Sequence, residues 1–138
     1  MLDLGSGSGI LAIAAVKLGA ARAIGIDTDP EANSVALRNA DRNGVTDRTE
    51  FLEGDAGALA PLVGPAALIV SNILRTANTA LLPSITRALE PGGLAIFSGM
   101  EHTEAAEFRQ VLAVADLDLA GEVVDSGWWG VAAGRGAE

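Results

Sequence analysis

Glycine-rich or polar stretches follow four apolar segments of the chain, and their residue types are those that bind a nucleotide-like cofactor. In chain order these stretches contain Gly5, Gly7 and Gly9, then Asp27, then Asp55, and then Asn72. If the apolar segments are strands of an open parallel sheet, ligands bind beyond the carboxyl ends of those strands. We therefore expect these residues to meet at one edge of a sheet and to form a binding site there.

The glycine loop has features that favour S-adenosylmethionine over a dinucleotide. Glycine at every second position lets the backbone turn sharply and approach a ligand closely, and the helix that follows points free N–H groups at it. A dinucleotide fingerprint requires glycine three residues after Gly7, where this chain has Ile10. Asp3, just before the loop, would repel a pyrophosphate. Its carboxylate could instead contact loop amides or the amino group of an amino-acid cofactor.

The two later aspartates could hold the ribose and the adenine of such a cofactor. A carboxylate at Asp27 can accept hydrogen bonds from both ribose hydroxyls; the alternative is a helix cap, for which Asp29 is better placed. Asp55 could accept a hydrogen bond from the adenine amino group, with Ala56 leaving room for the ring, or it could stabilise a turn. The residues expected to bind the cofactor are Asp3, Gly5, Ser6, Gly7, Asp27, Asp55, Ala56 and Asn72.

Apolar runs that alternate with helical patterns predict an α/β fold with a mostly parallel sheet. Strands are expected at 1–4, 23–26, 49–52, 66–71, 94–98, 117–124 and 128–133, seven in all. Helices are expected over 9–18, from 30 to about 43, and over 77–89 and 103–114. Pro83 predicts a kink or a late start in the third helix, and Pro91 to Gly93 should form a turn. The last two strands should form an antiparallel hairpin.

Composition restricts the class of protein. The 138 residues suit one domain, and 49% hydrophobic with 4% aromatic residues suits helices packed on a buried sheet. A net charge of −9 argues against direct nucleic-acid binding and favours a cationic partner. With no cysteine and one histidine, we expect no disulfide and no metal site. The sequence has no long apolar run and no secretory signal, so we expect a cytoplasmic protein without a membrane partner.

Three blocks of sequence resemble the bacterial methyltransferase family that modifies the eleventh protein of the large ribosomal subunit. Asp3 to Ala14 and Gly25 to Pro30 are similar to motifs shared among class I methyltransferases. The block from Ile69 to Leu74 is more specific, because relatives that modify amides or bases usually carry Asn-Pro-Pro where this chain has Asn-Ile-Leu. The other similar stretches are Leu89 to Gly93, Ser98-Gly99 and the late tryptophan, Trp128 or Trp129.

The resemblance implies a Rossmann-like class I methyltransferase with helices on both faces of its sheet and S-adenosylmethionine as cofactor. It implies that Gly5, Asp27 and Asn72 contact this cofactor. The acceptor it implies is an amine, of a lysine side chain or of a chain N-terminus, in a basic ribosomal protein. Relative to the family, we expect residues 1–138 to be the cofactor-binding domain alone, without the preceding domain that recognises the ribosomal protein and without a threonine-containing segment that covers the cofactor.

Asn72 is the candidate catalytic residue. Its side-chain oxygen could accept an N–H of the acceptor amine and so aim the lone pair at the methyl group, although an amide cannot act as a base. Alternatively, it caps the end of its strand or the next helix. Arg75 could bind a substrate carboxylate or be solvated. We expect one of Trp128 and Trp129 to lie in the core and the other on the surface.

The same residues are compatible with other functions. A fragment that binds the cofactor without turnover would carry these motifs, and so would a methyltransferase that acts on a small molecule. A nicotinamide-dependent oxidoreductase is disfavoured, because Ile10 replaces a fingerprint glycine and Asp3 would face the pyrophosphate.

Overall fold

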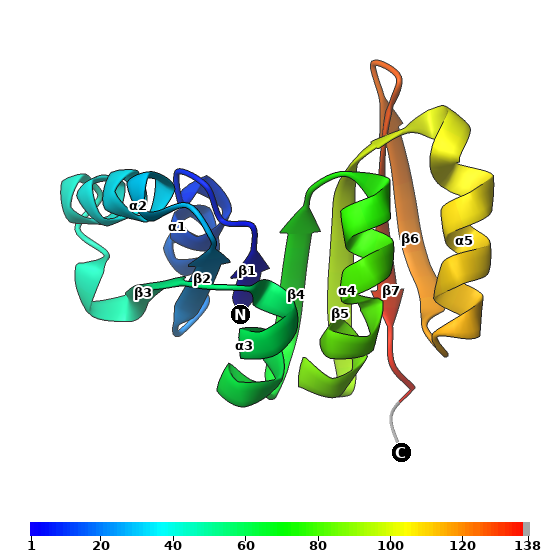
Figure 1. Ribbon diagram of the computed structural model, residues 1–138, viewed down its shortest axis with the longest axis horizontal. Helices are drawn as coiled ribbons and strands as arrows, with labels where there is room; N and C mark the ends of the chain where they lie inside the picture. The colour runs from blue at the N-terminus through cyan, green and yellow to red at the C-terminus, as the bar shows by residue number, and fades with distance from the viewer. Residues whose placement is uncertain (137–138) are drawn as a thin grey trace.

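The computed structural model describes residues 1–136, which form a seven-stranded sheet flanked by helices (Figure 1). No helix in this part of the chain is long and apolar enough to cross a membrane. The elements in chain order are β1 (Leu2–Leu4), α1 (Ile10–Lys17), β2 (Ala23–Asp27), α2 (Pro30–Arg42), the 3-10 helix η1 (Thr46–Arg48), β3 (Thr49–Glu53), α3 (Ala56–Val63), β4 (Ala66–Asn72), α4 (Arg75–Ala88), β5 (Leu89–Glu101), the 3-10 helix η2 (His102–Glu104), α5 (Ala105–Val114), β6 (Asp118–Asp125) and β7 (Trp128–Gly134).

The strand order creates a binding edge between β1 and β4. The strands lie in the order β3-β2-β1-β4-β5-β7-β6. The first five in this order are parallel, whereas β7 is antiparallel to both β5 and β6. The chain moves outward from β1 to β3 and then returns to β4 on the other side of β1, so the winding reverses there. Ligands of open parallel sheets bind at this reversal, beyond the carboxyl ends of the strands. The predicted mostly parallel sheet with a C-terminal hairpin is confirmed.

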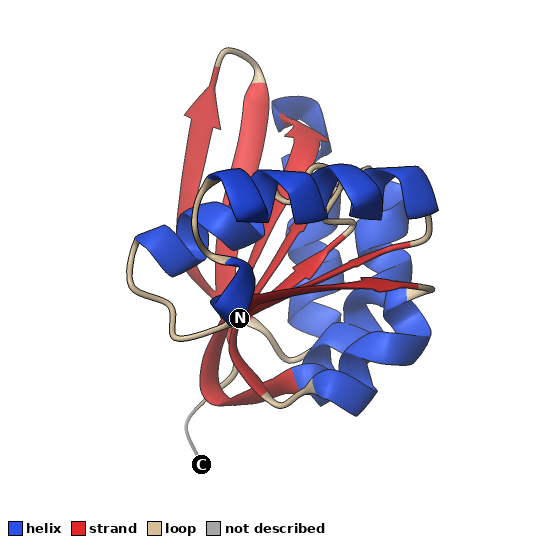
Figure 2. Cartoon of the chain, turned by 90° about the vertical axis from the view of Figure 1, so that its left-hand side faces the viewer, coloured by secondary structure: helices blue, strands red, loops and turns tan. Residues whose placement is uncertain are grey.

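Helices cover both faces of the sheet, as Figure 2 shows. α1 and α2 pack together beside β1, β2 and β3, while α3, α4 and α5 form a second group, in which α3 contacts β1 and β2, α4 contacts β4 and β5, and α5 contacts β6. The larger apolar core lies under this second group. Its aromatic centre is Phe108, whose ring meets Phe97 and Trp129 edge to face at centroid distances of 5.2 and 6.1 Å. This core fixes β4 and β5, the strands whose ends carry Asn72 and Ser98.

Local sequence explains where α2 begins and ends, as predicted. The Asp29 carboxylate accepts a hydrogen bond from Glu31 N at 2.9 Å, and Pro30 occupies the first helical position, where its missing N–H is not needed. Gly44 follows the helix with a φ of 66°, a conformation that glycine adopts without strain. Asp29 is thus the cap, which leaves the Asp27 carboxylate available for other contacts.

Helix α3 was not predicted from the sequence. Gly57 and Pro61 lie within it, and both residues lower the helical propensity of a segment this short. The helix forms because Asp55 caps its first turn by accepting a hydrogen bond from Ala58 N at 2.9 Å, and because Ala60 is buried against the core. The alternative prediction for Asp55 is that it stabilises a turn; in the structure it caps a helix instead.

Helix α4 and strand β5 both start earlier than expected. The prediction that this helix starts late, near Pro83, is wrong, because α4 begins at Arg75 and continues through this proline to Ala88. Leu82 and Ile85 are fully packed in the core on either side of Pro83, and their burial outweighs the hydrogen bond that a proline cannot donate. β5 begins at Leu89, so the predicted turn at Pro91 to Gly93 lies within an irregular part of this strand. The other predicted boundaries match or differ by at most three residues.

Candidate active site

The carboxyl ends of β1, β2 and β3 surround a cavity of about 360 Å³. Four of the residues predicted to bind a cofactor line it together: Gly5, Asp27, Asp55 and Ala56. The rest of the wall was not predicted from the sequence and comes from Ile26, Thr28, Gly54, Ile73, Ala77, Ala80 and Leu81. The polar groups of β2 and of the loop after β3 therefore face a mainly apolar surface contributed by α4.

The glycine loop needs glycine because of both its conformation and its neighbours. Gly5, Gly7 and Gly9 have φ values of 71°, 53° and 79°, which other residues adopt only with strain. A Cβ on Gly5 would lie 2.8 Å from Ile73 Cγ2, and one on Gly9 would lie 2.9 Å from the Phe51 ring. Gly5 and Gly9 are thus packed against their surroundings, and Gly5 is the loop residue that lines the cavity.

Asp27 connects this loop to β2. One carboxylate oxygen accepts a hydrogen bond from Gly7 N and the other accepts one from Asp29 N, each at 2.9 Å. Every carboxylate oxygen can accept a second hydrogen bond, so Asp27 retains capacity toward the cavity that it lines. The same residue fixes the loop and presents an anion to the site.

Asp3 lies behind the loop instead of lining the cavity. It is 1% exposed, and its Oδ2 accepts a hydrogen bond from Ala12 N, in the first turn of α1, at 3.2 Å. Burial raises the pKa of the Asp3 carboxyl to about 6; the Ala12 hydrogen bond opposes this shift and the Asp27 charge adds to it. Ser6 and Gly7 also lie outside the wall, with Ser6 buried and its backbone N–H donating to Ile26 O.

Asn72 lines a second cavity, of about 450 Å³, at the ends of β4 and β5. Its Oδ1 accepts a hydrogen bond from the Ser98 hydroxyl at 2.8 Å, and one lone pair on this oxygen is left. In the sequence, Ser98 belongs to a stretch that is similar to the methyltransferase family, but no role was predicted for it. Its position on the strand next to that of Asn72 cannot be inferred from the spacing of the two residues. The other lining residues are Gly99, Val123, Asp125, Trp128, Trp129 and Gly130.

The two cavities lie on either side of the loop after β4, because Asn72 lines one and the next residue, Ile73, lines the other. On the far side of the second cavity, Trp128 is 58% exposed while Trp129 is 1% exposed, in agreement with the predicted division between surface and core. The cavity lined by Gly5, Asp27 and Asp55 thus adjoins a second cavity lined by apolar side chains and Asp125, with Asn72 and Ile73 between the two.

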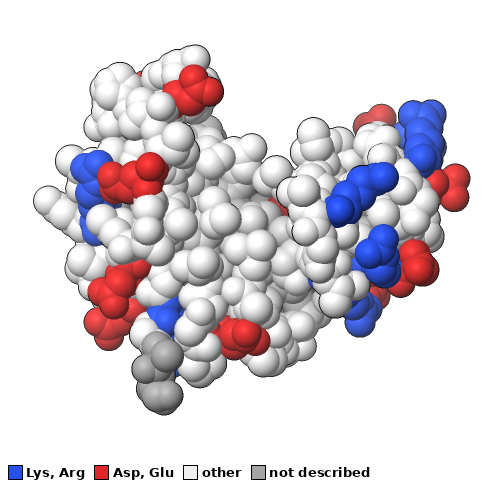
Figure 3. Space-filling model, turned by 180° about the vertical axis from the view of Figure 1, so that it is seen from behind, with Lys and Arg blue, Asp and Glu red and all other residues white. Residues whose placement is uncertain are grey.

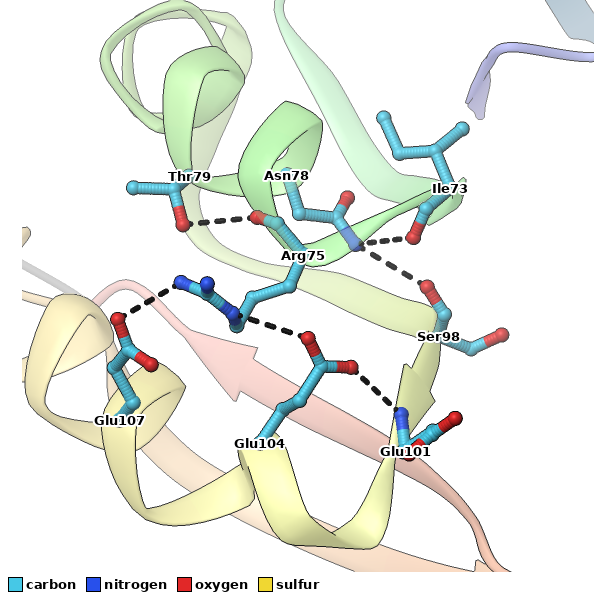
Figure 4. Close-up of polar contacts among 8 residues, drawn as sticks. All are labelled: Ile73, Arg75, Asn78, Thr79, Ser98, Glu101, Glu104 and Glu107. Atoms are coloured by element: carbon cyan, nitrogen blue, oxygen red, sulfur yellow. Dashed lines mark hydrogen bonds and ion pairs between the residues drawn. The ribbon is translucent and has the colours of Figure 1, made fainter.

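Arg75 matches neither expectation for it. Its guanidinium donates to Glu104 at 3.1 Å and to Glu107 at 2.9 Å, as Figure 4 shows, and its side chain is only 24% exposed. It is therefore neither free to bind a substrate carboxylate nor simply solvated. Instead, Arg75 joins the start of α4 to η2 and α5.

Charge is unevenly spread over the surface. In Figure 3, seen from behind, Lys and Arg side chains gather at one end of the molecule and alternate there with acidic ones. The exposed basic residues of α1, α2 and the segments around them are Lys17, Arg22, Arg38, Arg42 and Arg48. The hollow at the top of the same view is almost free of charge. Basic side chains are thus concentrated away from the cavity that Asn72 lines.

The sheet order, the glycine loop after β1 and the antiparallel final hairpin define the Rossmann-like fold of class I methyltransferases. The RNA methyltransferase from Salinibacter ruber, solved in complex with S-adenosyl-L-homocysteine, has this fold: its TM-score is 0.75 at 25% identity, covering 99% of this chain and 80% of that one. The ribosomal protein L11 methylase from Lactobacillus delbrueckii subsp. bulgaricus is more similar, with a TM-score of 0.90 at 34% identity, covering 98% and 69%.

Sequence comparison identifies the family. The model of the family described as ribosomal protein L11 methyltransferase (PrmA) matches residues 1–135, and the chain belongs to this family. The ribosomal protein L11 methyltransferase of Thermus thermophilus is 43% identical over 135 residues, which are 98% of this chain and 52% of that protein. The chain spans about half the length of the curated relatives it matches.

Proposed function

We propose that this chain is an S-adenosylmethionine-dependent methyltransferase domain that transfers methyl groups to protein amines. The observation that carries the proposal is the position of Asn72 and Ile73 between two cavities, one of which contains the cofactor-type residues. Family membership supports the same conclusion. The acceptor amine, from a lysine side chain or a chain N-terminus, would enter by the second cavity and the cofactor would occupy the first.

The residues around the first cavity fit this cofactor. The remaining acceptor capacity of Asp27 suits two ribose hydroxyls, and the second carboxylate oxygen of Asp55, which does not contact Ala58, suits an exocyclic amino group. Ala56 and Leu81 provide an apolar wall for a planar ring. Positive φ at Gly5 brings the backbone close to the ligand. We also propose that Asp3, Ser6 and Gly7 contribute to this site, through the loop they support.

The chain's own residues supply positioning more than acid–base chemistry. Bound S-adenosylmethionine supplies an electrophilic methyl group on a sulfonium. A lysine amine with a pKa near 10.4 must first lose a proton, which costs about 4 to 5 kcal/mol at pH 7. An apolar cavity disfavours the ammonium form and lowers that cost. The free lone pair of Asn72 Oδ1 can then accept one amine N–H, while the Ser98 hydroxyl holds the amide in place.

We propose ribosomal protein L11 as the substrate, because the chain belongs to the family described by that activity. A basic ribosomal protein also suits a chain with a net charge of −9. We further propose that residues 1–138 are one cofactor-binding domain, that the reaction occurs in the cytoplasm, where ribosomal proteins are made, and that the chain does not itself bind nucleic acid.

Methyl transfer to purified L11 from labelled S-adenosylmethionine tests this proposal, with mass spectrometry to locate the label on amines. We expect label on lysine side chains or the N-terminal amine of L11. Asn72→Ala should lower kcat about tenfold or more, equivalent to at least 1.4 kcal/mol. Asn43→Ala, a substitution at the exposed end of α2, is the control and should leave kcat unchanged. Label on carboxylates or amides, or an Asn72→Ala variant with full activity, would contradict the proposal.

A further inference from the structure

A buried amide in α4 joins the two loops that meet at the proposed acceptor site. Asn78 is 0% exposed. Its Nδ2 donates hydrogen bonds to Ile73 O at 3.1 Å and to Ser98 O at 3.2 Å. Figure 4 shows this side chain directed from α4 toward the end of β4 and toward β5. One side chain thus holds the backbone after β4 and the backbone near the end of β5.

The two carbonyls that Asn78 binds belong to residues on which the geometry of Asn72 depends. Ile73 is the next residue in the chain after Asn72, and its own N–H donates to Ser98 O at 3.2 Å. The hydroxyl of Ser98 donates to Asn72 Oδ1. Any movement of these two backbone segments relative to each other therefore changes the direction of the Asn72 amide.

The side chain of Ile73 also packs against the glycine loop. A Cβ on Gly5 would lie 2.8 Å from Ile73 Cγ2, so the side chain of Ile73 rests directly against the loop backbone. On the other side, a Cβ on Gly99 would lie 2.5 Å from Ile73 O. Ile73 is therefore enclosed between the glycine loop, at Gly5, and strand β5, at Gly99. Its backbone has little room to move.

The Asn78 side chain is suited to donating, since its Oδ1 is buried and has no hydrogen-bond partner among the described residues. A buried oxygen without a partner is unfavourable, and the two hydrogen bonds donated by the amide offset part of this cost. A second connection nearby, from Arg75 to Glu104 and Glu107, joins α4 to η2 and α5 and does not contact the backbone of Ile73 or Ser98. Of the two side chains, Asn78 is the one that hydrogen-bonds to the backbone of both Ile73 and Ser98.

We propose that Asn78 is a positioning residue for methyl transfer: its two donated hydrogen bonds hold Ile73 and Ser98 so that Asn72 faces the acceptor amine. This inference rests on the proposed function. Asn78 lines neither cavity and does not act on the substrate itself. It acts through Asn72, so its loss should change the rate of transfer more than the affinity for the cofactor.

The test compares Asn78→Asp with Ser84→Ala in the full chain. Asn78→Asp keeps the shape of the side chain but places carboxylate oxygens against two carbonyl oxygens. Ser84 is a matched control, since it is a buried polar residue of the same helix whose hydroxyl donates to a backbone carbonyl of α3, Gly57 O, at 2.7 Å. If Asn78→Asp does not fold, Asn78→Ser, which is neutral and smaller, is used with the same expectations.

Two readouts are needed, and the first does not require activity. Hydrogen exchange of the Ile73 amide should accelerate about tenfold or more in Asn78→Asp and stay unchanged in Ser84→Ala. In methyl transfer to L11, kcat should fall about tenfold or more in Asn78→Asp while the affinity for S-adenosylhomocysteine stays within about threefold. Ser84→Ala should change neither quantity at a temperature where both variants are folded.

Unchanged Ile73 exchange in Asn78→Asp would overturn the inference, whether or not the protein is active. So would a fall in kcat that is matched by an equal loss of cofactor affinity, because general damage to the fold would explain it. If wild-type protein transfers no methyl group, the proposed function fails while the exchange measurement still decides whether Asn78 holds this loop. The two failures are therefore distinguishable.

Discussion

At the scale of single residues, Asp27 has a structural and a ligand-binding role at the same time. Its carboxylate accepts hydrogen bonds from Gly7 N and Asp29 N, and it also lines the cavity to which we assign the cofactor. A neutral amide at this position could accept from one of the two N–H groups but would direct its own NH₂ at the other. Substitution therefore affects both the loop and the ligand.

We predict that Asp27→Asn weakens binding of S-adenosylhomocysteine about tenfold to a hundredfold, because hydrogen bonds to a charged acceptor contribute about 1.5 to 3 kcal/mol. Asp29→Asn is the matched control, since it stands two residues away, does not line the cavity and can still cap α2. Isothermal titration calorimetry measures both. Equal affinities of the two variants for S-adenosylhomocysteine would show that Asp27 does not bind the cofactor.

The buried carboxyl of Asp3 should make the free energy of unfolding depend on pH. The folded state raises the pKa of this carboxyl from 3.8 to about 6, so the folded chain holds a proton that the unfolded chain releases between these values. The free energy of unfolding should therefore fall as pH rises from about 4 to about 6 and then level off, with a total loss of about 3 kcal/mol at most.

Asp3→Asn should remove this dependence, because an amide oxygen can accept the Ala12 hydrogen bond without becoming charged. Urea denaturation at a series of pH values measures the effect. We expect the variant to be more stable than wild type above pH 6 and similar to it below pH 4. A wild-type protein whose stability rises through this range, with no difference from the variant, would show that Asp3 is not buried as described.

At the scale of elements, the sequence predicts well where local rules act and less well where packing decides. The glycine loop and the Asp29 cap of α2 follow from short-range rules, and both are present. Helix α3 and the continuous α4 contradict local propensity at Pro61 and Pro83 and depend on burial that sequence alone does not reveal. The partnership of Ser98 with Asn72 depends on strand register, which links residues 26 positions apart.

Strand β5 provides the test at this scale. Gly99 has a φ of 83°, and a Cβ there would lie 2.5 Å from Ile73 O, so Gly99→Ala has to distort the contact between β5 and the loop after β4. We predict a loss of at least about 2 kcal/mol in the free energy of unfolding. Gly121→Ala in β6 is the control, because a Cβ there meets nothing within 4 Å. Chemical denaturation that gives both variants equal stability would contradict the described packing.

At the scale of the whole molecule, the net charge of −9 bears on how a substrate approaches. An acidic protein attracts a basic partner through long-range fields that salt screens within about 10 Å at 0.1 M. Five of the nine Lys and Arg residues of the chain, namely Lys17, Arg22, Arg38, Arg42 and Arg48, lie on or beside α1 and α2, whereas the second cavity is lined by residues at the ends of β4 and β5 and in the hairpin of β6 and β7 (Figure 3). A basic acceptor should therefore approach the cavity end of the molecule.

We predict that the KM for L11 rises with sodium chloride concentration while the KM for S-adenosylmethionine changes little, because the cofactor's contacts are short-range hydrogen bonds. Steady-state kinetics at low and high salt measure both constants. A KM for L11 that is insensitive to salt would exclude charge as the source of recognition, and an equal rise in both constants would indicate a general effect of salt on the enzyme.

We assign the cavity beside Gly5, Asp27 and Asp55 to S-adenosylmethionine. Calorimetric titration of the wild-type chain with S-adenosylhomocysteine, and separately with NADH, tests this assignment. We expect saturable binding of S-adenosylhomocysteine at one site and no binding of NADH. Absence of heat with S-adenosylhomocysteine at millimolar concentration, or saturable binding of NADH in its place, would contradict it.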